Sequence, residues 1–310
     1  METVETLKNK VDFSVMFSVK DANPNGDPLN GNRPRINYEG IGEVSDVCIK
    51  RKIRNRLMEA GQSIFVQSDD NRIDDYRSLR SRVEGEIRGD VFKDEKRYRE
   101  EVCKKWIDVR AFGQVFAFKS KDSKKGGKLK EVEDEKFEDK SVSIGIRGPV
   151  SVHSAFSVLP IGASISSIQI TKSVSNEDNN GKKSSDTMGM KHRVDNGIYV
   201  FHGAINPQLA SKTGFNNEDS KAIKEALVHL FENDSSSARP EGSMEVQLMI
   251  WWEHNCSTGQ YSSAMVHRSL SVEPKKQDSK GIDDYKIKLK EFSELKPEIF
   301  NPNNLNIEYV

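Results

Sequence analysis

The stretch that most constrains the fold joins a strand to a long turn-rich loop. Apolar residues alternate from Val11 to Val19, which is the period of a half-buried β-strand. The loop 20–44 that follows carries three prolines and four glycines, so it can hold neither a regular helix nor a long strand. The sequence therefore predicts a core strand that ends in an extended, irregular connection.

A basic helix is predicted directly after this loop. Ser45 suits the N-cap position, and Asp46 would face the positive end of the helix dipole. Gly61 is the predicted C-cap, and the apolar stripe is formed by Ile49, Ile53, Leu57 and Ala60. No acid separates the cations, so we predict that pairing inside the helix does not neutralise them and that they contact phosphate: Lys50, Arg51, Lys52 and Arg54. A solvated helix face is the alternative.

The loop before the helix has the composition of a backbone anion site. Asn and Gly tolerate unusual φ angles, and Gly26 leaves backbone N–H groups accessible. Arg33 and Arg35, spaced by one residue, would point the same way from an extended chain. We therefore take Asn23, Asn25, Gly26, Arg33 and Arg35 as candidate RNA-binding residues, with an ordinary long connection as the alternative.

Two later segments add candidates. Arg147 and Gly148 form a cation-plus-backbone element at a strand end, just before a proline. A long hairpin is predicted over 164–201, and an apolar methionine near its tip could wedge between bases. Local packing and a plain strand end are the alternatives. The hairpin candidates are Lys172, Met188, Lys191, His192 and Arg193.

Sites of catalysis or metal binding are not predicted. The histidines lack metal-type spacing, no nucleophile or dinucleotide motif occurs, and three scattered cysteines suggest neither zinc nor disulfides. Asp21, Asp27 and Asp46 flank the basic region and could hold Mg²⁺ for strand cleavage, but turn and cap roles are preferred. We expect no cofactor, no metal and no catalytic residue.

The charge distribution supports a local phosphate site. The formal net charge is zero, which argues against a uniformly basic nucleic-acid binder. From 31 to 56, however, seven Lys or Arg residues stand against three Asp or Glu residues. A basic stripe can bind phosphate on a neutral molecule. The absence of a long apolar run and of a signal-peptide pattern predicts an intracellular, cytoplasmic protein with no membrane partner.

The remaining segments give an α+β order. Segment 68–106 is charged and helical with sparse apolar residues, so we expect it to bury little and to project. Segment 119–140 has the composition of a loop or disordered insertion. A helix at 218–232 and a strand at 245–252 follow. This order predicts a sheet with helices on one face, in the ferredoxin-like or RNA-recognition-motif class.

Eight ordered motifs resemble a known family, the CRISPR-associated Cascade backbone subunits of the Cas7 superfamily, with type I-C closer than type I-B. The first three are Asn23-Pro-Asn-Gly-Asp-Pro28, Arg33-Pro-Arg35 and the segment 44–55. The others are Asp108-Val-Arg-Ala-Phe-Gly-Gln114, Gly145-Ile-Arg-Gly-Pro-Val150, Thr187-Met-Gly-Met-Lys-His192, Gly197-Ile-Tyr199 and Ser235-Ser-Ser-Ala-Arg239.

The resemblance implies a modified RNA-recognition-motif palm at 1–61, 107–163 and 202–310. It implies helical fingers at 62–106 and a thumb hairpin at 164–201. Copies would stack head-to-tail along a CRISPR RNA beside a small Cas5-type subunit and a large subunit, and the guide would stay exposed for pairing with target DNA. Each thumb would displace one nucleotide.

The resemblance further implies a subunit that is not a nuclease. Two other functions stay open on the residues alone: a metal-dependent ribonuclease using Asp21 and Asp27, and an assembly scaffold that needs no RNA.

Overall fold

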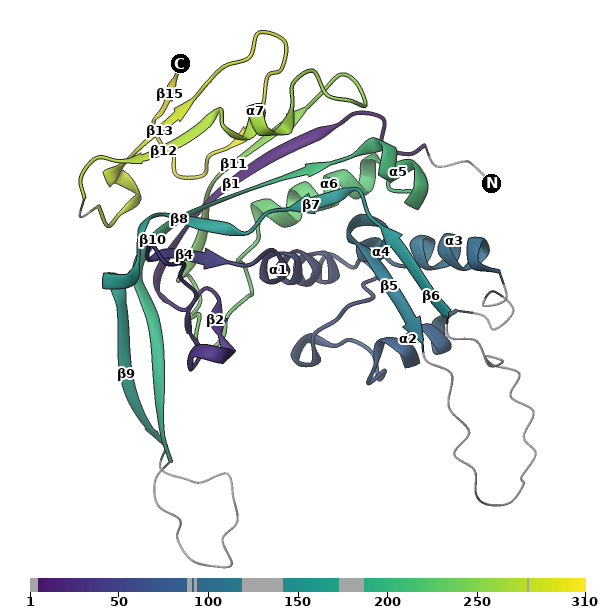
Figure 1. Ribbon diagram of the computed structural model, residues 1–310, viewed down its shortest axis with the longest axis horizontal. Helices are drawn as coiled ribbons and strands as arrows, with labels where there is room; N and C mark the ends of the chain where they lie inside the picture. The colour runs from purple at the N-terminus through teal and green to yellow at the C-terminus, as the bar shows by residue number, and fades with distance from the viewer. Residues whose placement is uncertain (1–4, 88–90, 92–93, 119–141, 173–186, 278) are drawn as a thin grey trace, which may run out of the picture.

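The computed structural model describes residues 5–87, 91, 94–118, 142–172, 187–277 and 279–310. It is a mixed α+β structure built on a large antiparallel sheet (Figure 1). The order across the sheet is β14 (Glu298–Phe300), β11 (Met244–Glu253), β1 (Val11–Ala22), β10 (Thr187–Ile205), β8 (Ala155–Pro160) and β4 (Ile41–Val44). Strands β7 (Val150–Val152) and β9 (Ile165–Lys172) also pair with β10. The predicted strand 11–19 and the predicted strand 245–252 are confirmed as β1 and β11.

Helices cover one face of the sheet. Odd-numbered residues of β1, including Phe13 and Phe17, pack in one core with α1 (Asp46–Glu59) and α6 (Asn217–Val228). Helix α5 (Pro207–Thr213) contributes Ala210 to the same core. Successive side chains of a strand point to opposite sides. The apolar alternation along β1 therefore explains why the odd-numbered residues are buried against the helices.

A small second sheet covers the other face. Strands β12 (Leu270–Pro274), β13 (Tyr285–Leu289) and β15 (Ile307–Tyr309) form it, and α7 (Ser263–His267) lies beside it. We call α7 and this sheet the C-terminal lobe. Met16 of β1 packs with Val266 and Leu289 of the lobe in a separate apolar core. The prediction of helices on one face holds for α1 and α6, but it missed this second layer.

Helix α1 starts where the sequence predicts. The Ser45 hydroxyl accepts a hydrogen bond from the Cys48 amide at 3.3 Å, which satisfies one free N–H of the first turn. The helix ends at Glu59 with Ala60 as the C-cap, so the predicted C-cap at Gly61 is one residue late. Gly61 has φ +79°, the left-handed conformation that commonly follows a helix end.

The charged segment after α1 folds around its own core. It contains α2 (Leu79–Glu86) and α3 (Glu95–Lys105), and α4 (Ile107–Phe112), β5 (Gly113–Phe118) and β6 (Val142–Arg147) follow. These elements pool their few apolar residues, among them Phe65, Val83, Tyr98, Val102, Trp106, Phe116 and Ile144. The prediction that this segment buries little is therefore wrong. The segment 119–140 predicted as a loop lies outside the described residues.

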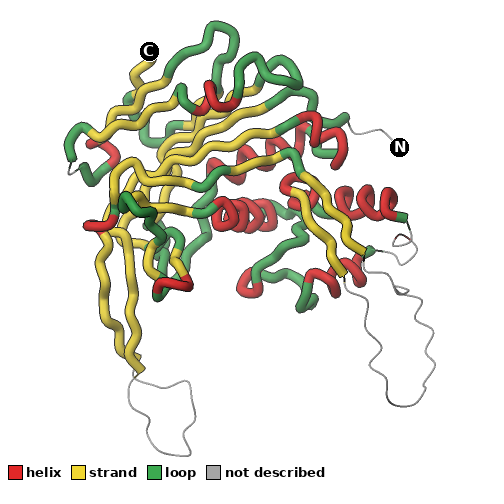
Figure 2. The backbone as a smooth tube through the Cα atoms, in the orientation of Figure 1, coloured by secondary structure: helices red, strands yellow, loops and turns green. Residues whose placement is uncertain are grey.

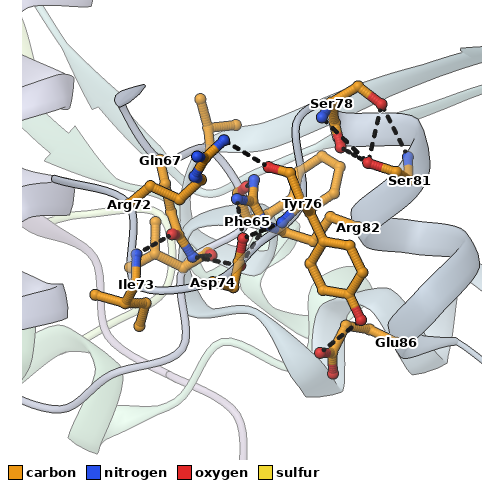
Figure 3. A network of polar contacts seen from close by, with 12 residues as sticks. Phe65, Gln67, Arg72, Ile73, Asp74, Tyr76, Ser78, Ser81, Arg82 and Glu86 are labelled. Carbon is orange, nitrogen blue, oxygen red and sulfur yellow. Dashed lines mark hydrogen bonds and ion pairs between the residues drawn. The ribbon is translucent and has the colours of Figure 1, made fainter. Parts of the chain in front are cut away.

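A polar network fixes the connection between α1 and α2 (Figure 3). The Arg82 guanidinium, 3% exposed, donates to both carboxylate oxygens of Asp74 at 2.8 Å and to the Phe65 carbonyl at 2.6 Å. Gln67 donates to Asp74 at 3.3 Å and accepts from the Ile73 amide at 3.1 Å. A bidentate guanidinium–carboxylate pair holds orientation as well as distance, so it gives this polar connection a defined shape.

A buried cluster of ionisable groups lies between the main sheet and α7. His254 Nε2 is 2.9 Å from Asp12 Oδ2, and His267 Nε2 is 3.2 Å from Asp12 Oδ1. Burial by itself would raise the pKa of Asp12, but hydrogen bonds from His254, His267 and Ser263 hold it below its usual range. The nearby charged or titratable groups are Lys10, His153 and His202. The Asp12 carboxylate therefore contacts both His254, which directly follows β11, and His267, the last residue of α7.

Acidification is expected to destabilise the folded protein between about pH 6.5 and about pH 4. Burial, together with the neighbouring His267 and His153, lowers the pKa of His202 to about 4. As pH falls through this window, the unfolded chain binds a proton at His202 and the folded protein does not. The free energy of unfolding therefore drops by up to about 3 kcal/mol. Urea titrations across the window measure this change.

The variant His202→Gln provides the comparison, because it removes the titrating ring and keeps a polar side chain. Its stability should depend less steeply on pH over the same range. An equally steep dependence would show that another group is responsible.

Among the described residues, none of the helices combines the length and the apolar character that crossing a bilayer requires.

Candidate nucleic-acid interface

The loop 23–35 folds against the start of α1. Strand β2 (Gly26–Asp27) pairs with β3 (Arg33–Pro34), and a short 3₁₀ helix, Pro28–Asn30, joins them. Asn25 Oδ1 accepts a hydrogen bond from the Ser45 amide at 2.9 Å, and the Arg35 amide donates to the Asn25 carbonyl at 3.1 Å. The loop thereby lies between α1 and the β9–β10 hairpin (Figure 1).

Asn23 and Gly26 shape this loop. Asn23 is 3% exposed, and its Nδ2 donates to the Asn32 carbonyl at 2.7 Å. A Cβ atom on Gly26 would lie 2.0 Å from Asn32 Oδ1, so a larger residue there would require the Asn32 side chain to move. Asn23 faces the protein interior, so we assign its side chain no contact with a ligand.

The first two cations of α1 face outward. Lys50 Nζ lies 2.9 Å from Asp46 Oδ2, one helical turn earlier. The prediction that pairing inside the helix leaves these cations without an acid is therefore wrong for Lys50. Arg51 is exposed on the same helix. These two residues remain available as the outward-facing charges of α1.

The other two candidate cations of α1, Lys52 and Arg54, face inward. Lys52 has a side chain 2% exposed, forms an ion pair with Asp234, and lies 5.4 Å from the Phe231 ring centroid. Burial lowers the pKa of the Lys52 ammonium. Arg54 donates from Nε to Asp108 Oδ2 at 2.9 Å and is 14% exposed. Neither charge faces solvent, because Lys52 points at the segment that follows α6 and Arg54 points at α4. Both are left out of the interface proposed below.

The loop arginines lie near one another and near acids. Arg33 is partly exposed in β3. Arg35 Nη2 lies 3.6 Å from Asp27 Oδ1. The Glu43 amide donates to the Arg35 carbonyl at 2.9 Å, which holds this part of the loop to β4. The structure therefore keeps both arginines at the surface beside the start of α1.

The hairpin divides its candidates between two faces. Lys191 and Arg193 lie on one face, because they are two residues apart in β10. Arg193 Nη2 is 3.4 Å from Asp21 Oδ1, and its Nε is 3.4 Å from Asp195 Oδ1. His192 lies on the opposite face, 9% exposed, with Nδ1 2.8 Å from the Ser167 hydroxyl. The side chains of Lys172 and Met188 lie outside the described residues.

Arg147 and Gly148 lie in a different part of the molecule. Strands β5 and β6 are on the far side of α1 from the β9–β10 hairpin (Figure 2). Arg147 is exposed at the end of β6. A Cβ atom on Gly148 would lie 2.2 Å from the Ala111 carbonyl oxygen. Gly148 therefore allows a close packing against α4 that a larger residue would prevent.

The flanking aspartates act as caps and ion-pair partners. Asp27 Oδ1 accepts from the Leu29 amide at 3.2 Å and caps the short 3₁₀ helix. Asp21 pairs with Arg193 and Asp46 pairs with Lys50. In the described part of the chain, no three His, Cys, Asp or Glu residues are grouped so that they could hold a metal ion.

Sequence reasoning missed the acidic partners of the cations. Asp234 and Asp108 are distant in sequence from Lys52 and Arg54, so no local pattern reveals these pairs. The Asp46–Lys50 pair was visible as an i,i+4 spacing.

A family model and a curated relative point to the same family. The family model described as CRISPR-associated protein Cas7 matches residues 9–290. CRISPR-associated protein Cas7 of Haloferax volcanii is 26% identical over 254 residues, which are 80% of this chain and 72% of that protein. Two solved chains, from a "CRISPR RNA-guided surveillance complex, pre-nicking" and a "CRISPR RNA-guided surveillance complex", are each 15% identical with a TM-score of 0.39. They cover 78% of this chain, and 78% and 68% of their own lengths respectively.

Proposed function

This chain belongs to the family of CRISPR-associated protein Cas7, and from that premise we propose that it is a non-catalytic, CRISPR RNA-binding backbone subunit of a type I-C surveillance complex. The family match over residues 9–290 is the observation that carries the proposal, because it spans the loop, α1 and the hairpin together. The protein would hold the RNA mainly through phosphates and leave sequence recognition to base pairing.

The proposed contacts come from three elements on one side of the sheet. Arg33 and Arg35 lie on the loop, Lys50 and Arg51 on α1, and Lys191 and Arg193 on the hairpin. Cations on separate elements can meet successive phosphates of an extended strand, and backbone N–H groups of the loop can add uncharged contacts. Arg147, beyond α1, would meet a more distant part of the same strand.

The finer family roles belong to this proposal. The palm would be 1–61, 107–163 and 202–310, with an RNA-recognition-motif-like sheet, the fingers 62–106 and the thumb 164–201. Copies would stack along the RNA with a Cas5-type subunit and a large subunit, and target DNA would pair with the exposed guide. Such an assembly would work in the cytoplasm.

A triple substitution tests the RNA grip. Arg33→Ala, Arg51→Ala and Lys191→Ala together remove one cation from each of the three elements. We expect the variant to bind a labelled single-stranded RNA more weakly at low salt, because three phosphate contacts are lost. The slope of log affinity against log salt should flatten by about two, at roughly 0.7 per contact.

The control removes the same total charge elsewhere. Arg268→Ala, Lys290→Ala and Lys296→Ala lie on exposed positions at or beside the C-terminal lobe. If both triple variants bind RNA alike, the loop, α1 and the hairpin are not the grip. If the unaltered protein does not bind RNA at all, the proposed function is wrong.

A further inference from the structure

We propose that Asp21, Asp27 and Asp46 are built-in counter-charges of the RNA interface, which make it select a chain of phosphates over single anions. This inference rests on the proposed RNA-binding function. The three aspartates occupy the cations before RNA arrives, so an incoming ligand must displace them. They therefore act as specificity-determining residues of the interface.

The geometry places one aspartate on a cation of each element. Asp46 Oδ2 is 2.9 Å from Lys50 on α1. Asp27 Oδ1 is 3.6 Å from Arg35 on the loop, and Asp21 Oδ1 is 3.4 Å from Arg193 on the hairpin.

All three pairs are partly open to solvent. The exposed fractions of the side chains run from 25% to 49%, in the order Lys50 25%, Asp27 27%, Arg193 36%, Arg35 37%, Asp46 39% and Asp21 49%. A phosphate can therefore reach the cations without unfolding any element.

The strength of these pairs sets the selectivity. Partly exposed ion pairs are weak, since solvent screens them and ordering two side chains opposes them. One free anion replaces one aspartate and gains little from the exchange, while it loses its own freedom of motion. A strand that carries several phosphates loses that freedom once and replaces three aspartates together. The counter-charges thus weaken the binding of a single anion, while a strand that replaces all three aspartates together still binds measurably.

These pairs partly compensate the basic charge of the proposed interface. The sequence has equal numbers of basic and acidic residues, and three of the acids lie on the very cations proposed to grip phosphate. The compensation shortens the distance over which this surface attracts anions, so a ligand must come into close contact before it is held.

Asparagine substitutions remove the charge and keep each local structure. Asp21 has φ +53°, and asparagine tolerates this left-handed conformation well. Asp27 caps the 3₁₀ helix through a side-chain oxygen, which asparagine also carries. Asp46 occupies the first turn of α1, where its side chain pairs with Lys50. Asp195 is left unchanged, because it also accepts from the Ser166 hydroxyl.

The test compares Asp21→Asn/Asp27→Asn/Asp46→Asn with the unaltered chain. Binding of a labelled single-stranded RNA should tighten about tenfold at low salt, as expected for the loss of three weak competing pairs. The salt dependence should steepen by up to about two in slope. Inorganic phosphate, used as a competitor, should raise the apparent Kd for RNA by a larger factor in the variant than in the unaltered protein.

The control removes the same number of negative charges at or beside the C-terminal lobe. Asp283→Asn, Glu294→Gln and Glu308→Gln are exposed positions there, and this triple variant should bind RNA within about twofold of the unaltered chain. Thermal melting of all variants checks folding, and Asp46→Asn alone serves if the triple variant melts early.

The outcomes separate the two proposals. If the unaltered protein binds RNA and Asp21→Asn/Asp27→Asn/Asp46→Asn binds no tighter, the counter-charge inference is overturned and the RNA function stands. If both triple variants tighten binding equally, the effect is one of net charge, and the inference is again overturned. If neither the unaltered chain nor any variant binds RNA, both proposals fall.

Discussion

The variant Arg110→Ala should lose about 3–5 kcal/mol of unfolding free energy. Arg110 donates from Nε and Nη2 to both oxygens of Asp219 at 2.8 and 2.7 Å. The Asp219 side chain is 5% exposed, and Arg110 also donates to the Cys103 carbonyl at 3.1 Å. Removing the guanidinium leaves a buried carboxylate without its counter-charge, which is among the most destabilising single changes. Urea unfolding of the full chain measures the loss.

Two comparisons sharpen this test. Arg110→Lys keeps the charge but not the fork of two parallel donors, so its loss should be intermediate. Arg77→Ala changes an exposed arginine on the connection before α2 and should stay within about 0.5 kcal/mol of the unaltered chain. If Arg110→Ala is no less stable than Arg77→Ala, the pair does not hold α4 to α6.

The variant Asp108→Ala should cost a similar amount, about 3–5 kcal/mol, with a local signature. Asp108 is fully buried and accepts from the Phe65 amide at 2.7 Å, the Val66 amide at 3.0 Å and Arg54 Nε at 2.9 Å. Alanine leaves two amides and a mostly buried guanidinium without an acceptor. Amide hydrogen exchange should speed up at Phe65 and Val66 before the main sheet opens.

The exposed Asp75 provides the matched control. Asp75→Ala should leave both the unfolding free energy and the exchange of the Phe65 and Val66 amides unchanged. Equal protection of these amides in Asp108→Ala and in the unaltered protein would contradict the assigned hydrogen bonds.

Asp108 and Arg110 have structural roles in this chain. Asp108 and Arg110 lie two residues apart in α4 and reach two different helices, since Asp108 binds Arg54 of α1 and Arg110 binds Asp219 of α6. The motif Asp108-Val-Arg therefore fixes α4 to α1 and α6, the helices that pack against the main sheet. From the sequence alone, this motif could equally have been interpreted as a binding site.

Local patterns predicted the elements that carry strong periodicity. The alternation from Val11 to Val19 gave β1, and the Ser45 cap with its stripe of apolar residues gave α1. Both signals depend only on neighbours along the chain. The motifs that resemble the Cas7 family gave the family, which the match over residues 9–290 confirms.

The candidate site was harder to predict, because a cation's role depends on what lies opposite it. Helical spacing places Lys50, Arg51, Lys52 and Arg54 around more than one side of α1. Which side is buried depends on Asp234 and Asp108, which come from other parts of the chain. The roles of Lys52 and Arg54 as internal ion-pair partners could not be read from their own segment.

The sequence by itself determined β1, α1 and the family, since these follow from spacing and motif order. Only the tertiary structure decided what the second face of β1 does. Asp12 and Ser14 are polar, and alternation alone would leave them in solvent, yet both are fully buried beneath the C-terminal lobe. That lobe supplies His267, and the residue directly after β11 supplies His254, both from more than 240 residues away in sequence. Burying a carboxylate requires such partners, and only folding brings them together.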